Sequence, residues 1–356
     1  MKIGLCGFPK VGKTSVFEAI TGLVSDAHAH STNIAAVPVP DQRLDRLFAD
    51  FPKSRKVQAK IEYLDPYLHE PGPDDAIGPS LNAVKSTSVL ALVVRGFENP
   101  NVPYVFQSID MKHAVAVSVE RMFEADTVVC ERRLEKIDVM YRKAKSDDLV
   151  RERAVIVKCL DHLRGASPLS QLELHPEERA VIQGIGFLTA KPLMIVLNVD
   201  EKDASTERLD NIAAEFTPLA PRYATVVALC ARLERELLEL DAQDRAMFMQ
   251  DAGLTSLAQE RVIRASYDAT GTICFFTIGD DEVRAWPLRA GTTAAKAAGT
   301  VHTDMERGFI RAEVISFDDY VKAGSMREVK AQKLNRLEGK DYVVADGDII
   351  EFRFHV

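Results

Sequence analysis

The sequence has few cysteines, no long apolar run and no excess of positive charge. Its five cysteines are widely scattered and include no C-x-x-C pair. With no secretory leader ahead of the first motif, this usage predicts a reduced, cytoplasmic protein. No apolar run approaches the about 18 residues that cross a bilayer, so no membrane partner is expected. The net charge of −8 argues against indiscriminate binding to nucleic acid and limits any RNA contact to a local basic face.

The chain does contain a complete phosphate-loop motif. Residues 7–14 read GFPKVGKT and fit G-x-x-x-x-G-K-[ST] without a gap. An apolar strand at 3–6 precedes the motif and an amphipathic helix at 15–20 follows it, which is the context that the motif requires. In such a loop Lys13 reaches the terminal phosphates and the Thr14 hydroxyl can hold Mg²⁺. The nucleotide-binding residues expected here are Phe8, Pro9, Lys10, Val11, Gly12, Lys13, Thr14 and Ser15.

Apolar strands separated by helical stretches indicate an α/β fold. The segment 57–63 alternates apolar and polar residues, as a half-buried strand does, and the strand ends at Asp65. Continuous apolar strands are expected at 89–94, 193–197 and 225–229. This series predicts a doubly wound, mostly parallel sheet covered by helices on both faces.

Two later regions differ from this pattern. Apolar residues recur at spacings of four and three from Cys130 to Ala144, and again from Val150 to Leu160 after a polar turn. Two antiparallel helices that form a coiled-coil arm fit this spacing, and two more helices packed on the sheet are the alternative. Beyond about residue 270 the chain is rich in β-forming segments, which predicts a separate small α+β domain with a strand-connecting turn at Asp346–Gly347.

A nucleotide-hydrolysing switch protein also needs a metal-linked aspartate and a mobile threonine. Asp65, at the end of its strand, is the expected aspartate for the metal, and a strand-end cap is the alternative. The glycine that usually follows three residues later is absent, because Leu68 occupies that position. Ser31 and Thr32 are the available hydroxyl groups for the switch threonine, although no P-F-x-T context surrounds them.

Residues 198–201 read NVDE and occupy the position of a base-specificity motif. Guanine recognition normally uses N-K-x-D, whose short carboxylate accepts both N1–H and N2–H of guanine. Here Val199 replaces the lysine and Glu201 is one methylene longer than aspartate, which favours ATP over GTP. Asn198 retains the groups that pair with the N6 and N7 edge of adenine. The small-residue loop over the base is expected at Cys230 and Ala231.

Together these motifs resemble the Obg-like ATPase family, also called YchF, over nearly the whole chain. Similar blocks also lie at 282–286, 297–304, 306–316 and 337–356. The resemblance implies a discontinuous P-loop nucleotide-binding domain at 1–118 plus 191–270, an inserted helical arm at 119–190, and a C-terminal β-grasp (TGS) domain at 271–356. It also implies association with the ribosome or structured RNA through the arm and the TGS domain. A basic stripe in that domain, which solvated helix charge would also explain, comprises Lys322, Arg327, Lys330, Lys333, Arg336 and Lys340.

The chain departs from the family pattern at several positions. The family normally has Asn where Lys10 stands, and that Asn is associated with a monovalent cation near the phosphates; the Lys10 ammonium is a candidate replacement. The D-I-A-G run of the family is replaced from Asp65 onward, and a histidine of a later loop corresponds to Tyr104. His69 is a candidate general base, with an exposed loop histidine as the alternative.

Two hypotheses of different classes follow from these residues. The first is an ATP-binding protein that acts at the ribosome in translation or stress control and hydrolyses ATP slowly at best. Its catalysis would depend on Lys13, Asp65, Mg²⁺ and backbone donors. The second is a non-catalytic ribosome- or RNA-binding paralogue whose nucleotide site is structural or empty. Retained specificity for GTP is a further possibility.

Overall fold

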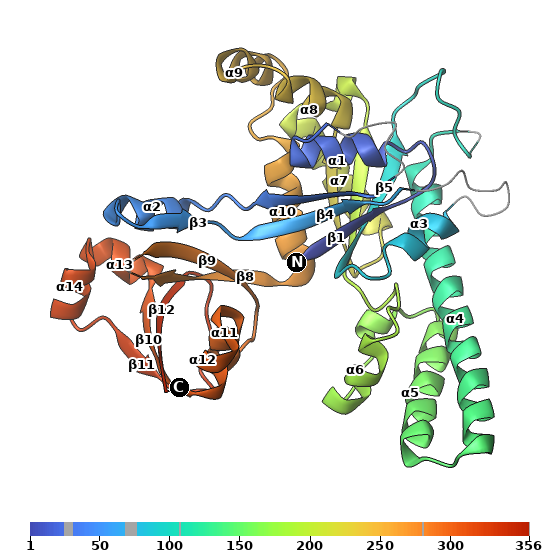
Figure 1. The fold of residues 1–356 in the computed structure, drawn as a ribbon. Coiled ribbons are helices and arrows are strands. Elements are labelled where there is room, and N and C mark those ends of the chain that lie inside the picture. The colour runs from blue at the N-terminus through green and yellow to red at the C-terminus, as the bar shows by residue number, and fades with distance from the viewer. Residues whose placement is uncertain (25–30, 68–76, 107, 280, 356) are drawn as a thin grey trace. The chain divides into compact units, whose positions relative to one another are not determined.

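The computed structural model describes residues 1–24, 31–67, 77–106, 108–279 and 281–355, which Figure 1 draws in colour. The chain divides into two units. The first unit comprises Met1–Val37 and Glu62–Ser266, and the second comprises Pro38–Ile61 and Tyr267–Val356. The chain therefore leaves the first unit between residues 38 and 61, and contributes this early segment to a unit that is otherwise C-terminal.

The first unit contains a six-stranded sheet with the order β2-β4-β1-β5-β6-β7. The strands are β1 Lys2–Cys6, β2 Asn33–Pro38, β4 Lys60–Asp65, β5 Val89–Gly96, β6 Leu193–Val199 and β7 Ala224–Leu229. Neighbouring strands from β4 to β7 pair in parallel, and every residue of β6 is buried. Burial on both faces explains the continuous apolar runs and confirms the predicted α/β class. The strand predicted from residue 57 begins instead at Lys60.

Helices flank this sheet, and local polar residues fix where several of them begin. They are α1 Lys13–Thr21, α3 Gly78–Ala83, α7 Thr206–Phe216, α8 Ala231–Leu238, α9 Ala242–Asp251 and α10 Ala258–Thr270. The Asp241 carboxylate, for example, accepts hydrogen bonds from the first free N–H groups of α9, those of Gln243 and Asp244, each at 2.9 Å. Within the described part of the chain, every helix is too short or too polar to span a bilayer.

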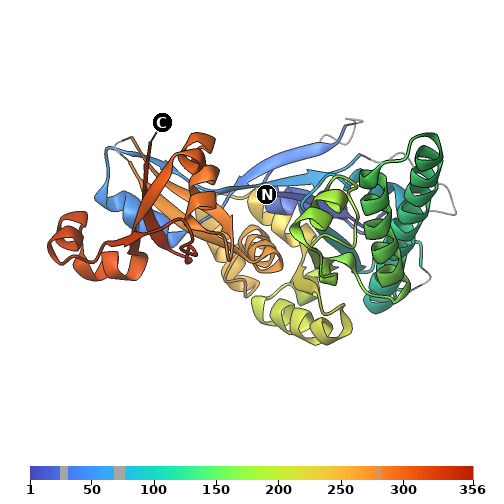
Figure 2. The same ribbon diagram turned by 90° about the horizontal axis from the view of Figure 1, so that it is seen from below.

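Two long antiparallel helices form the arm between β5 and β6, as predicted. Helices α4 Met111–Lys143 and α5 Asp147–Arg164 lie side by side in both views (Figures 1 and 2), and the shorter α6 Pro176–Gln183 packs against α5. The predicted stripe residues Cys130, Ile137 and Leu160 are buried in the core of the arm. Helix α4 begins at Met111, eight residues before the boundary that the family resemblance implies.

A buried carboxylate joins this arm to the turn that precedes β6. Asp126 of α4 is 1% exposed, and its two oxygens accept hydrogen bonds from the Leu188 amide at 2.9 Å and from the amide and hydroxyl of Thr189 at 2.7 Å each. Burial raises the pKa of Asp126, and these three hydrogen bonds oppose that rise by favouring the charged form. The contact fixes the position of α4 relative to the chain that enters the sheet.

The second unit contains another six-stranded sheet, with the order β11-β10-β12-β8-β9-β3. Its strands are β3 Arg55–Val57, β8 Thr272–Ile278, β9 Glu282–Arg289, β10 Phe309–Ser316, β11 Arg336–Glu338 and β12 Asp348–Phe354, and its helices are α2 Gln42–Asp50, α11 Ala294–Val301, α12 Thr303–Arg307, α13 Phe317–Ala323 and α14 Met326–Ala331. A buried Phe275 packs against Trp286 and Phe352 in its core. The turn expected at Asp346–Gly347 precedes β12, but Val343 before it forms only an isolated bridge with Thr293 rather than a strand.

Specific contacts explain why residues 38–61 join this second unit, although the resemblance placed them in the nucleotide-binding domain. Strand β3 pairs in parallel with β9. The Arg43 guanidinium forms an ion pair with Asp346 at 2.7 Å, and the Tyr320 hydroxyl donates to Asp50 at 2.7 Å. The local sequence of this segment does not indicate partners that lie more than 200 residues away in the chain.

We expect the substitution Asp126→Ala to destabilise the protein, because it leaves two buried backbone N–H groups and one hydroxyl without an acceptor. The expected loss is about 2–4 kcal/mol in the free energy of unfolding. Asp161→Ala is the matched control, since Asp161 is an exposed aspartate of the same arm, and it should change stability by less than about 0.5 kcal/mol. Thermal and urea unfolding measure both variants. Equal stability of the two would contradict the anchoring role of Asp126.

Candidate nucleotide-binding site

The residues predicted to bind a nucleotide lie where the parallel strands end. The phosphate loop follows β1, Asp65 ends β4, Asn198 and Val199 end β6, and Cys230 follows β7. Because the carboxyl ends of parallel strands meet at one edge of a sheet, the fold brings these separated motifs to the same edge. Ligands of open α/β sheets commonly bind there.

Backbone geometry explains both glycines of the phosphate loop. Gly7 and Gly12 have φ angles of 142° and 89°, a region that side chains disfavour. A Cβ atom on Gly7 would lie 2.5 Å from the carbonyl oxygen of Val93, and one on Gly12 would lie 2.4 Å from Nδ2 of Asn198. Any side chain at either position would therefore displace the loop from the neighbouring strands.

Lys13 extends back across the loop. Its ammonium donates hydrogen bonds to the carbonyl oxygens of Gly7 at 3.1 Å and Phe8 at 2.9 Å. Desolvation lowers the pKa of Lys13, and the negative charge of Asp65 opposes this shift. The positive charge is thus held at the centre of the loop, where the motif requires it to meet phosphate oxygens.

Asp65 lies against Thr14, the other residue predicted to hold a metal. Its side chain is buried, with the residue 4% exposed, and Oδ2 accepts hydrogen bonds from the Thr14 hydroxyl at 2.8 Å and from the Asn33 amide at 3.4 Å. Burial raises the pKa of Asp65, while these two hydrogen bonds and the Lys13 charge lower it. Asn33, at the start of β2, is a site residue that the sequence motifs did not indicate.

These oxygens fit Mg²⁺ only as part of a larger ligand set. The described residues contain no cluster of three His, Cys, Asp or Glu side chains that would hold a metal by themselves. Mg²⁺ usually binds through one or two protein oxygens, with phosphates and water supplying the rest. The Thr14 hydroxyl and the Asp65 carboxylate supply such oxygens beside the phosphate loop.

The expected switch residues are only partly described. The Thr32 hydroxyl accepts a hydrogen bond from the Tyr67 amide at 3.3 Å, just beyond the end of β4, and Ser31 is exposed. Leu68 and His69 lie outside the described residues. The roles of Ser31 or Thr32 as a metal ligand and of His69 as a general base therefore stay predictions.

Asn198 connects three segments of the site through one buried amide group. Its Nδ2 donates to the Val11 carbonyl at 3.1 Å, and its Oδ1 accepts from the Ala231 amide at 3.1 Å. The side chain thereby joins the end of β6 to the phosphate loop and to the start of α8. Both polar groups of the Asn198 amide thus bind the protein's own backbone in this structure. Recognition of an adenine base by Asn198 stays a prediction.

The other residues predicted to bind the nucleotide differ in their exposure to solvent. Val199, Cys230 and Ala231 are buried, whereas Glu201 is exposed and begins the short 3₁₀ turn Glu201–Asp203. In the phosphate loop, Phe8 packs edge-on against Phe106, with ring centres 4.9 Å apart. Pro9 and Ser15 are half-buried, and Lys10 is exposed.

Arg95, in β5, contacts the backbone of the phosphate loop, and the sequence motifs did not indicate it. It is 2% exposed, and its guanidinium donates to the carbonyl oxygens of Phe97 at 3.1 Å, Val102 at 3.0 Å and Lys10 at 3.4 Å. It also lies over the ring of Tyr104 at 5.0 Å, and burial raises the pKa of Tyr104 to about 12. An arginine within the apolar run VLALVVRG was the available signal.

The chain has relatives along its entire length. It is 36% identical to the ribosome-binding ATPase YchF of Escherichia coli O157:H7 over 365 residues, which cover 100% of this chain and 99% of the relative. It is 32% identical to the ribosome-binding ATPase YchF of Bacillus subtilis over 362 residues, with 99% of each chain covered. The chain belongs to the YchF family.

Two further comparisons agree with membership in the YchF family. The family model YchF-GTPase_C, described as "Protein of unknown function (DUF933)", matches residues 272–355. A solved structure of the Schizosaccharomyces pombe YchF GTPase matches with a TM-score of 0.79 and 26% identity, over 99% of this chain and 97% of that one. The resemblance seen in the motifs is confirmed, as is the YchF arrangement of a six-stranded α/β sheet, a long helical insert and a C-terminal β domain.

We expect Asn198→Ala to loosen the site, because it leaves the Val11 carbonyl and the Ala231 amide without their buried partner. The expected loss is about 1–3 kcal/mol in the free energy of unfolding. Nucleotide affinity should fall at least about tenfold, which corresponds to about 1.4 kcal/mol. Calorimetric titration and thermal unfolding measure these effects, with Asn211→Ala, an exposed asparagine of α7, as control. Unchanged stability and affinity in Asn198→Ala would refute the connecting role.

Proposed function

We propose that this protein is an ATP-binding P-loop NTPase that hydrolyses ATP slowly and associates with the ribosome. The observation that carries this proposal is the meeting of Lys13 and Thr14 of the phosphate loop with Asp65 at the end of β4. Full-length homology to proteins named ribosome-binding ATPases supports it.

The residues of the candidate site have separate roles in nucleotide binding. Lys13, which now donates to two loop carbonyls, would turn its ammonium toward the terminal phosphates and neutralise their charge. Thr14 and Asp65 would hold Mg²⁺, which supplies further neutralisation of phosphate charge when bound. Asn198 keeps the loop and the start of α8 in register, so the cradle exists before a ligand arrives.

Slow hydrolysis is expected because the sequence lacks two groups that normally assist the attack of water on the terminal phosphate. The sequence offers no glutamine of the kind that positions the attacking water, and Leu68 stands where a glycine amide normally approaches the terminal phosphate. Catalysis would then depend on the Lys13 charge, on Mg²⁺ and on the loop amides. We expect binding to be much better preserved than turnover.

The preference for ATP is carried by Val199 and Glu201. Val199 is buried at the end of β6 and offers no charge to the base, and the exposed Glu201 differs in length from the aspartate that reads guanine. The names of the relatives differ on this point, since the bacterial proteins are called ATPases and the yeast structure a GTPase. Direct comparison of the two nucleotides therefore belongs in the first experiment.

Ribosome association would use exposed cations of the second unit. Arg327, Lys330 and Lys333 are exposed on and just after α14, and no ion pair of theirs is present among the residues that the structure describes. By contrast, Lys322 lies 3.8 Å from Asp319 and Arg336 lies 3.8 Å from Glu338. Unpaired exposed cations are the groups that bind phosphates of RNA most readily.

The first test is a calorimetric titration of ATP and GTP with Mg²⁺, followed by an assay of phosphate release. Lys13→Ala should weaken ATP binding by about 30- to 140-fold, as expected for loss of a charge-assisted contact of about 2–3 kcal/mol, and should abolish turnover. Lys53→Ala, an exposed lysine of the second unit, is the control. Tighter binding of GTP would overturn the base preference, and binding without turnover would favour the non-catalytic alternative.

The second test is co-sedimentation with ribosomes, with and without ATP. We expect co-sedimentation that weakens as salt rises and that falls when Lys330 and Lys333 are both changed to Glu, because each reversal replaces attraction to phosphate by repulsion. Lys53→Glu, which changes the charge elsewhere on the same unit, serves as control. A complete absence of co-sedimentation under all conditions would rule out ribosome association.

A further inference from the structure

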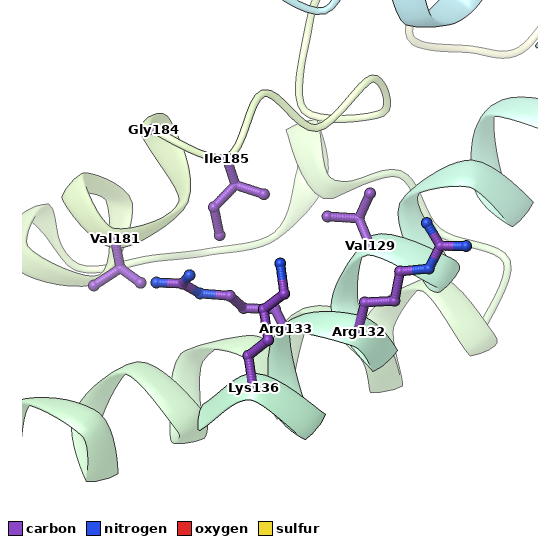
Figure 3. Close-up of a pocket in the computed structure, with 7 residues that line it drawn as sticks. All are labelled: Val129, Arg132, Arg133, Lys136, Val181, Gly184 and Ile185. Carbon is purple, nitrogen blue, oxygen red and sulfur yellow. The ribbon is translucent and has the colours of Figure 1, made fainter. Parts of the chain in front are cut away.

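The arm contains a cavity that the proposed nucleotide site does not use. Its volume is about 450 Å³, and it lies between one face of α4 and the end of α6 with the turn that follows (Figure 3). Two arginines, one lysine, three aliphatic residues and one glycine line it, namely Arg132, Arg133, Lys136, Val129, Val181, Ile185 and Gly184.

The spacing of the α4 residues shows that one wall of the cavity is a single face of that helix. On α4 the four lining residues follow at intervals of i, i+3, i+4 and i+7, and beside them Val181, Gly184 and Ile185 follow at i, i+3 and i+4. Residues at these intervals share one side of a helix. The aliphatic members also pack against the buried core of the arm, which gives the cavity a firm apolar wall.

The charges of this cavity are only partly balanced. Arg133 forms an ion pair with Glu152 at 2.5 Å, whereas Arg132 and Lys136 are exposed and form no ion pair with any described residue. Figure 3 shows Arg133 and Lys136 extending from α4 toward Val181 and Ile185, whereas the Arg132 side chain lies on the other side of Val129 and points away from them. In a chain whose net charge is −8, this local excess of positive charge attracts an anion.

We propose that this cavity binds a nucleotide, either free or as one residue of a single-stranded RNA. Guanidinium and ammonium groups recognise the phosphate, and the aliphatic wall of Val129, Val181 and Ile185 accepts the face of the base. A volume of about 450 Å³ falls within the usual range for small-molecule sites. The site is separate from the phosphate loop, so it does not depend on the proposed ATPase function.

Gly184 provides a way to close the cavity without straining the fold. Its φ of −78° and ψ of −12° suit any residue, and a Cβ atom placed on it would meet no atom within 4 Å. Gly184→Phe therefore adds a large side chain to the lining of the cavity while all three cations remain. Lys136→Glu makes the complementary change, since it reverses one charge and leaves the volume open.

The experiment titrates full-length Lys13→Ala protein, so that the phosphate loop contributes little, with AMP, inorganic phosphate, adenosine and a six-residue single-stranded oligoadenylate. AMP or the oligonucleotide should bind at least about tenfold more tightly than phosphate or adenosine, because only they engage both the cations and the apolar wall. Lys136→Glu and Gly184→Phe should each weaken this binding at least about tenfold. Lys143→Glu, an exposed lysine of the same helix outside the cavity, should leave it unchanged.

Each outcome decides between sources or refutes the site. Binding of AMP alone identifies a free nucleotide, and binding of the oligonucleotide alone identifies RNA. Equal affinity for phosphate and AMP would show a simple anion site and overturn the nucleotide assignment. Absence of binding by every probe, or binding that neither Lys136→Glu nor Gly184→Phe weakens in folded protein, would overturn the proposal, while ATP binding by the wild-type chain would stand apart from either result.

Discussion

The buried amide of Asn198 is the contact on which the geometry of the candidate site depends. Through Val11 and Ala231 it holds together loops that are 187 and 33 residues away from it in the sequence. The contact requires that Gly12 carry no side chain, because a Cβ there would lie 2.4 Å from the amide nitrogen. One hydrogen-bonding group thus determines both the conformation of the phosphate loop and the position of the segment expected to cover the base.

Buried polar groups with hydrogen-bond partners recur in the first unit. Arg95 donates to backbone carbonyls below the loop, Asp65 accepts from Thr14 and Asn33, and Asp126 accepts from the turn before β6. Each of these groups would destabilise the folded state if it were buried without a partner, because its lost hydration would not be replaced by a hydrogen bond. The hydrogen bonds of Arg95 and Asp65 indicate a site that is shaped before ligand binding, which suits a binding protein whatever its rate of hydrolysis.

The parts of the structure that follow local rules were predictable from the sequence. The phosphate loop, the apolar strands β5, β6 and β7, and the two arm helices all carry their own periodic or motif signals. The pairing of β3 with β9, the anchor at Asp126 and the role of Arg95 depend on partners that are distant in sequence. No local pattern encodes such a partner, so those contacts required the folded chain.

Lys10 illustrates how a substitution within a motif can leave its geometry intact. Its φ of 62° lies in the left-handed region, where asparagine is tolerated better than lysine, and the cost for lysine is about 1–2 kcal/mol. The Arg95 guanidinium binds the Lys10 carbonyl, and the flanking strand and helix fix both ends of the loop, so the surrounding structure holds this conformation. What residue 10 must supply to the cradle is therefore its backbone. Its side chain is exposed, so the geometry of the loop does not require an asparagine at this position.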